Sequence, residues 1–199
     1  MSRARMEAFS DGVLAVAITL LVLDLHVQPT SGGHLLGQLL AAWPSFVAFL
    51  VSFVVIGVIW VNHHAIVRLA DSVDRWLLFA NLLLLLFVTT LPFASSTLSG
   101  AIAEGDAADI RVAAAVYGGV MTGMAVAFTL LYGRITSMLV ISGAMDQRVR
   151  RARMVRFSAG VLLYPLMTVI GLFYAPAMLA AFAALSIYYL FNQTGVSHN

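Results

Sequence analysis

The sequence predicts an all-α integral membrane protein with six transmembrane helices in a single domain, residues 1–199. Apolar residues make up 61% of the chain and charged residues only 10%, whereas soluble domains carry roughly 25% charged residues. Polar or turn-forming segments separate six apolar stretches, and the arginines gather on one side of the resulting topology. The predicted spans cover residues of about 8–27, 36–67, 76–98, 110–132, 157–174 and 177–191.

The first predicted span, residues 8–27, is interpreted as a retained helix and not as a cleavable signal peptide. Glu7 and Asp11 follow the basic start of the chain, and Asp24 lies where a small-residue cleavage site is expected. Asp11 is unusual because a charge inside an apolar span is costly, and such residues normally face a bundle interior with a partner.

The second and third spans are separated by a short polar hairpin that ends at Arg75. Trp43 and Pro44 near the start of the second span predict an interfacial first turn, which shortens its buried part. The fourth span, 110–132, is rich in glycine and alanine, which permits close helix contact.

The last two spans are shorter and carry their own markers. Pro165 predicts a kink in the fifth span, and the sixth ends in Tyr188 and Tyr189 at interface depth. Residues 192–199 are expected to form a polar tail.

With six spans, almost all arginines fall on one side of the membrane, and the positive-inside rule places both termini in the cytoplasm. Arg111 alone falls on the opposite side. The basic cluster between the fourth and fifth spans is interpreted first as this topology signal, and second as a contact with anionic lipid. The arginines on the rich side are Arg3, Arg5, Arg68, Arg75, Arg134, Arg148, Arg150, Arg151, Arg153 and Arg156.

The chain lacks the motifs of several other classes. It contains no cysteine, no phosphate-binding loop, no HExxH motif and no GxSxG motif. The TVGYG filter of ordinary potassium channels is also missing. We therefore expect no enzymatic activity, no metal or other cofactor, and no nucleic-acid partner.

On a helix of 100° per residue, Val16, Leu20 and Leu23 share one narrow face of the first span, with Thr19 on its shoulder. Ser10 and Asp11 lie on the back. From periodicity alone, the default interpretation of an aliphatic stripe is a face toward lipid or another helix. The alternative, which the polar residues on the back favour, is a helix that lines an ion pore.

Asp11 has two interpretations that the residues alone leave equal. Either it begins the membrane helix as an N-cap, or it pairs with polar groups at the cytoplasmic end of the second span. The histidine pair there is more typical of a hydrogen-bonded helix end than of a metal site. The candidate partners are Trp60, Asn62, His63 and His64.

Three motifs together resemble the bacterial members of the transmembrane protein 175 (TMEM175) family. They are R-x-x-x-F-S-D-G at residues 5–12, W-V-N-H-H at 60–64 and NLLLLLFVTTLPF at 81–93. The resemblance implies a homotetramer of six-span subunits in the bacterial plasma membrane that conducts potassium in preference to sodium. The bilayer and the permeant potassium ion are then the expected partners.

The resemblance also implies roles for individual residues. The first helix lines the pore, Val16, Leu20 and Leu23 form its constriction, and Thr19 helps to coordinate the ion. We place Asp24 at the outer mouth, where it raises the local cation concentration. The implied supporting polar network consists of Arg5, Phe9, Ser10, Asp11, Trp60, Asn62, His63 and His64.

The alternatives to a channel are a small secondary transporter, a structural membrane protein and an intramembrane enzyme that uses Asp11, His63 and His64. A transporter predicts ionisable groups at the middle of several spans, and the last four spans have none there except tyrosine. An enzyme predicts loss of turnover, with the fold retained, when a histidine is replaced.

Overall fold

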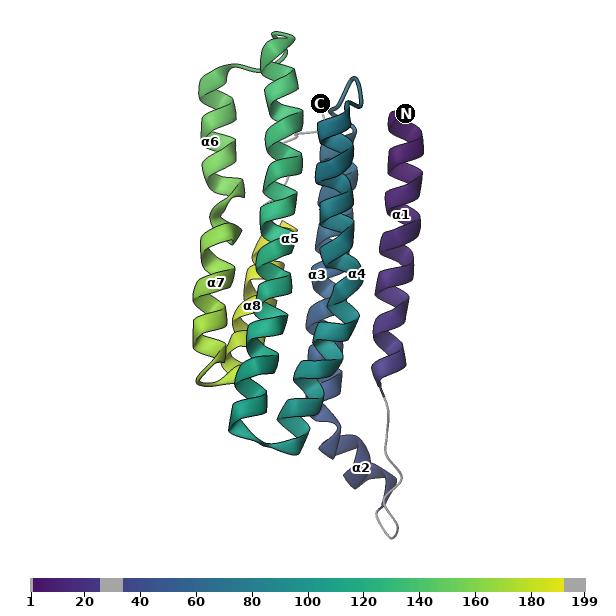
Figure 1. The fold of residues 1–199 in the computed structure, drawn as a ribbon, viewed down its shortest axis with the longest axis vertical. Coiled ribbons are helices and arrows are strands. Elements are labelled where there is room, and N and C mark those ends of the chain that lie inside the picture. Colours follow the sequence, from purple (N-terminus) through teal and green to yellow (C-terminus); the bar gives the residue numbers. More distant parts are fainter. Residues whose placement is uncertain (1, 26–33, 192–199) are drawn as a thin grey trace.

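The computed structural model describes residues 2–25 and 34–191, and all regular elements in those ranges are helices. Figure 1 shows them as a bundle of long, roughly parallel rods with the shorter α2 at one end. In chain order the helices are α1 (Arg3–Leu20) with its 3₁₀ extension η1 (Leu21–Asp24), α2 (Leu35–Ala41), α3 (Trp43–Val67), α4 (Arg75–Glu104), α5 (Ala107–Ile141), α6 (Gln147–Phe157), α7 (Ala159–Gly171) and α8 (Ala175–Phe191).

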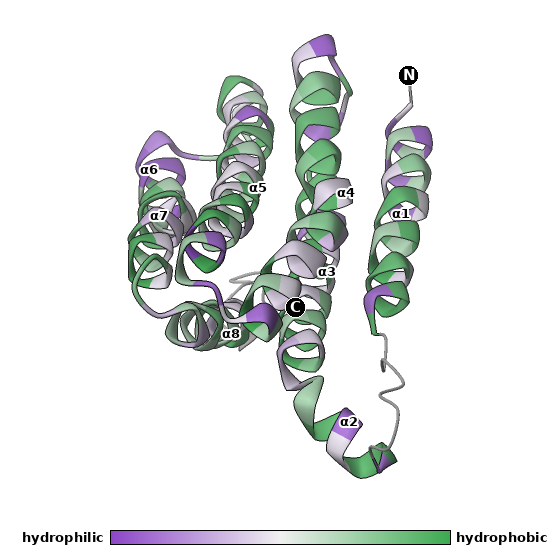
Figure 2. Cartoon of the chain, turned by 60° about the horizontal axis from the view of Figure 1, so that its bottom comes forward, coloured by the Kyte–Doolittle hydropathy of each residue, from purple (hydrophilic) through white to green (hydrophobic). Residues whose placement is uncertain are grey.

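Five helical stretches within the described ranges are long and apolar enough to cross a membrane, so the chain is a multi-pass membrane protein. A further apolar helix, Ala175–Tyr189, is shorter. Figure 2 shows hydrophobic residues along most of each rod, with hydrophilic residues concentrated near the ends. The five long stretches are Arg3–Asp24, Trp43–Val67, Arg75–Glu104, Ala107–Ile141 and Gln147–Gly171.

The second predicted span, residues 36–67, forms two helices that meet at Ala42. Pro44 occupies the first turn of α3, where a residue without a backbone N–H is tolerated because that N–H has no helical partner. The predicted span is therefore divided into α2 and α3, and Trp43 and Pro44 form the start of α3. The predicted end of the first span at Val27, the loop after it and the tail 192–199 lie outside the described residues.

The basic segment after the fourth predicted span is helical. Helix α5 continues past Tyr132 to Ile141, and α6 then runs back along it. Asp146 caps α6 by accepting a hydrogen bond of 2.6 Å from the Arg148 backbone N–H, and arginine is a good helix former. The break before α7 falls at Ser158, and Pro165 lies inside α7.

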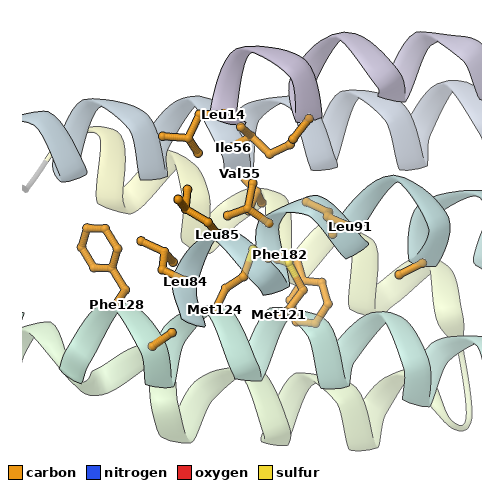
Figure 3. Close-up of a cluster of buried hydrophobic side chains, with 14 of the residues drawn as sticks. Leu14, Val55, Ile56, Leu84, Leu85, Leu91, Met121, Met124, Phe128 and Phe182 are labelled. Atoms are coloured by element: carbon orange, nitrogen blue, oxygen red, sulfur yellow. The ribbon is translucent and has the colours of Figure 1, made fainter. Parts of the chain in front are cut away.

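Helix α4 lies at the centre of the bundle and packs against α1, α3 and α5. In Figure 3 its leucines meet side chains of α3 and α5, and Leu14 of α1 and Phe182 of α8 complete the cluster. Two glycines of α5 permit close contact. A Cβ on Gly123 would lie 2.3 Å from the Phe87 ring, and one on Gly118 would lie 2.0 Å from the Thr168 hydroxyl.

Candidate functional site

Helix α1 stands at one edge of the bundle, beside α3 and α4 (Figure 1). One of its faces is buried against these two helices, and the residues on that face follow a spacing of three or four, as an amphipathic helix requires. The opposite face is exposed in the described part of the chain and is nonetheless apolar. The buried face consists of Met6, Ser10, Leu14, Ala17 and Leu21.

The predicted pore residues all lie on the exposed face. Val16 is 57% exposed, Leu20 42% and Leu23 62%. Thr19 is exposed beside them, and its hydroxyl lies 2.8 Å from the Val16 carbonyl oxygen and 3.1 Å from the Ala15 carbonyl oxygen. Because the hydroxyl proton is directed to the helix's own backbone, the lone pairs of the oxygen are available on the exposed side.

A buried polar network joins α1 to α3 and α4 behind this face. Ser10, Asn81 and His63 are each at most 1% exposed. The Asn81 amide donates to the Ser10 hydroxyl at 2.9 Å, and its carbonyl oxygen lies 2.7 Å from His63 Nε2. The Ser10 hydroxyl also lies 2.8 Å from the Met6 carbonyl oxygen. Asn81 is therefore the residue through which all three helices are connected.

Further polar contacts hold the N-terminal half of α1 against α3. The Trp60 indole N–H donates to Asp11 Oδ1 at 3.0 Å, so Asp11 has the partner that its position requires. His64 Nδ1 lies 2.8 Å from a Glu7 carboxylate oxygen. Arg3 closes the end of the helix by donating to the carbonyl oxygens of Arg68 and Ala70.

Other members of the predicted network lie elsewhere. Arg5 is exposed, and Phe9 is 50% exposed on the same side as the predicted pore residues. Asn62 is buried but faces away from α1, and its amide donates to the Val58 carbonyl oxygen at 2.7 Å. Asp24 is half-buried at the end of η1.

Two residues of the network were missed by sequence reasoning, namely Asn81 and Glu7. In the sequence, Asn81 stands out only as the first residue of the motif at 81–93. A lone amide within a run of leucines is itself the signal, because a polar group buried in an apolar helix needs a hydrogen-bond partner on a neighbouring helix. Glu7 was read only as evidence against a signal peptide, although its carboxylate pairs with one of the predicted histidines.

The geometry supports a structural role for the polar groups. Among residues 2–25 and 34–191, no three His, Asp or Glu side chains are grouped so that they could hold a metal ion. Asp11, His63 and His64 each contact a different residue. Together the polar groups join one side of α1 to α3 and α4, and the aliphatic stripe lies on the other side.

Comparison with known proteins gives the chain its relatives. A family model described as the endosomal/lysosomal potassium channel TMEM175 matches residues 5–92. A Streptomyces collinus protein named a potassium channel is 45% identical over 194 residues, which cover 96% of this chain and 93% of the relative. The human relative, named an endosomal/lysosomal proton channel, is 37% identical over 103 residues, 47% of this chain and 20% of its own.

A solved structure agrees with the fold. The crystal structure of a TMEM175 homologue from Chamaesiphon minutus, titled a lysosomal potassium-selective channel homologue, superposes with a TM-score of 0.77 at 34% identity. The match covers 94% of this chain and 96% of that one. The near-complete coverage by both comparisons extends the likeness beyond the N-terminal motifs to all the helices, and the chain therefore belongs to the TMEM175 family.

Proposed function

We propose that the protein is a subunit of a homotetrameric potassium channel and that α1 lines its pore. The observation that carries this proposal is the pair of opposite faces on α1. One face is bonded to the subunit through Ser10 and Asn81, while Val16, Leu20 and Leu23 lie exposed on the other. Four copies that meet through this exposed face would enclose a path lined by aliphatic side chains. The relatives named potassium channels support the choice of ion.

Stacked rings of Val16, Leu20 and Leu23 would form the constriction. A narrow aliphatic ring blocks ions because water leaves it, and ions do not enter a dry pore. A small rotation or splaying of α1 would widen the rings and allow water to enter. The rigid attachment of the back of α1 means that such a movement has to involve α3 and α4 as well, since Asn81 ties the three helices together.

Selectivity for potassium over sodium needs ligands that aliphatic side chains do not supply. Thr19 is the candidate, because its hydroxyl oxygen is exposed beside the stripe while its proton is directed to the backbone. Four such oxygens, together with water, would replace part of the hydration shell, which potassium sheds at lower cost than sodium does. Asp24 at the outer end of α1 would raise the local cation concentration.

The proposed location is the bacterial plasma membrane, with six spans and both termini in the cytoplasm. The arginines carry this orientation, because those at the start of α1, in the α3–α4 hairpin and along α6 all lie at one end of the bundle. Arg111 lies near the start of α5, at the other end.

Ion flux through the purified full-length protein in liposomes tests the proposal. We expect a potassium gradient to dissipate faster than a sodium gradient of equal size, with empty liposomes as the control. Because mammalian relatives are named proton channels, the internal pH is recorded in the same experiment. Proton flux without potassium flux, or equal rates for potassium and sodium, would contradict the proposed selectivity. A potassium flux that saturates at a few ions per second for each protein would favour the transporter alternative.

A further inference from the structure

A cavity lies on the side of α3 that faces away from α1. It is partly open, has a volume of about 70 Å³ and lies between α3, α5, α7 and α8. Most of its lining is apolar, and a few polar side chains interrupt it. The apolar lining includes Val55, Met121, Met124 and Phe128, and the polar lining includes Asn62, Tyr164, Ser186 and Tyr189.

The cavity lies beside the C-terminal part of α8. In Figure 1, α8 covers only the lower part of the neighbouring helices and ends about halfway along α5. Ser186 and Tyr189, from the end of α8, line the cavity. Beyond that point, toward the cytoplasm, α5 and α6 continue as a hairpin. The cavity therefore lies at the depth of the cytoplasmic leaflet.

A basic site lies directly beyond the cavity. On α5, the lining residues Met121, Ala125 and Phe128 lead at helical spacing to Tyr132, about 6 Å further toward the cytoplasm. The side chain of Arg153, on α6, lies near Tyr132. On the other wall, Gly160 and Tyr164 of α7 line the cavity.

Arg150 lies one turn beyond Arg153, about 60° away around the helix. Its Nε atom is buried and has no hydrogen-bond partner among the described residues. Neither arginine pairs with a carboxylate in that part of the chain, where the ion pairs are His64 with Glu7 and Arg134 with Asp74. Arg150, with its unpartnered Nε, and Arg153, without a carboxylate partner among the described residues, lie beyond one end of an apolar cavity, and together the arginines and the cavity provide the two halves of an amphiphile site.

We propose that an anionic phospholipid of the cytoplasmic leaflet binds here, with its phosphate on Arg150 and Arg153 and the end of one acyl chain in the cavity. Arginine binds phosphate through paired N–H donors, and basic residues just outside a span attract anionic lipid. The cavity lining also carries the hydroxyls of Tyr164 and Tyr189, which can meet polar groups of the bound lipid.

The proposed lipid site takes no part in the proposed ion selectivity. It lies next to the buried polar network that connects α1 to α3 and α4. Asn62, which lines the cavity, precedes His63, which binds Asn81. The two side chains leave α3 about 100° apart, so α3 separates the lipid site from α1. A bound lipid would therefore stabilise the side of α3 that faces away from α1.

The test compares variants of the full-length protein by native mass spectrometry after equilibration with equal amounts of phosphatidylglycerol and phosphatidylcholine. We expect the wild type to retain phosphatidylglycerol preferentially and the double variant Arg150→Gln/Arg153→Gln to bind it about 30-fold more weakly, since each basic residue near the membrane contributes about fivefold. The matched control Arg148→Gln/Arg151→Gln removes the same charge from the opposite face of α6 and should stay within a few-fold of wild type.

A second variant tests the cavity. Ala125→Phe fills the space, with Thr129→Phe as the replacement if that variant fails to fold, and either should reduce the retained lipid without altering its charge preference. Three results would overturn the proposal: equal loss from both arginine pairs, full displacement of the lipid by inorganic phosphate, or much greater lipid retention in a chain ending at residue 191. The last result would mean that residues 192–199 occupy the cavity.

Discussion

Replacing Asn81 by leucine removes the residue that connects three helices while conserving most of its volume. The Ser10 hydroxyl keeps its contact with the Met6 carbonyl oxygen, so that side costs about one hydrogen bond, or ~1 kcal/mol. The cost at His63 is larger, because its buried Nδ1 atom already has no hydrogen-bond partner among the described residues and Nε2 would lose its partner as well. An unsatisfied buried polar group costs ~1–3 kcal/mol. Asn81→Leu should therefore reduce the free energy of unfolding by about 2–4 kcal/mol.

The assay is the denaturation midpoint of the purified protein in mild detergent, read by helical circular dichroism. The informative control is the double variant His63→Leu/Asn81→Leu, since replacing both partners by apolar side chains of similar shape is close to neutral. We expect the double variant to recover much of the stability that Asn81→Leu loses. Two results would contradict this role of the network. One is a free energy of unfolding for Asn81→Leu within about 0.5 kcal/mol of wild type. The other is a double variant whose loss equals the sum of the losses of Asn81→Leu and His63→Leu measured singly.

Three further changes have expected outcomes of their own. Leu20→Ala widens one ring of the proposed constriction and should raise leak and lower potassium selectivity in bilayer recordings; an unchanged reversal potential and current would count against that face. The hydrogen bond from Arg134 lowers the pKa of the Asp74 carboxyl, so its stabilisation is present above the ordinary aspartate pKa and is lost as pH falls below about 4. The acid loss of melting temperature should accordingly be smaller in Asp74→Asn than in wild type, and identical pH profiles would refute that role. Gly118→Val places a side chain against Thr168 and should cost about 1–3 kcal/mol or more; a neutral melting temperature would mean that α5 and α7 are not packed closely.

The sequence was sufficient for the class of the fold and for the two faces of α1. Low charge content and long apolar runs predict membrane helices because unpaired polar groups are costly in a bilayer. The helical phase of Val16, Leu20 and Leu23 against Ser10 follows from local spacing alone, and the structure places the aliphatic residues on the exposed face and Ser10 on the buried one.

Contacts between segments far apart in the sequence could not be predicted from local patterns of residues. The Ser10–Asn81 bond joins residues 71 positions apart, and no periodicity in either helix identifies the partner. Asn62 and His63 are neighbours in sequence but contact different parts of the bundle, so a motif that includes both does not identify which one is bonded toward α1. Helix α6 was likewise not predicted, because an arginine-rich segment between two spans is typical of a loop that sets the topology, although arginine is also a good helix former.

The central claim is that the exposed face of α1 lines an ion pathway and does not face lipid. The chain has no cysteine, so a single substitution gives a unique reactive site without background. Leu20→Cys tests the face, and Leu162→Cys, 77% exposed on α7 at the opposite edge of the bundle, is the matched control. We predict that silver ions block potassium current through Leu20→Cys and leave Leu162→Cys conducting. Equal sensitivity of the two variants, or persistent current through silver-treated Leu20→Cys, would contradict the account.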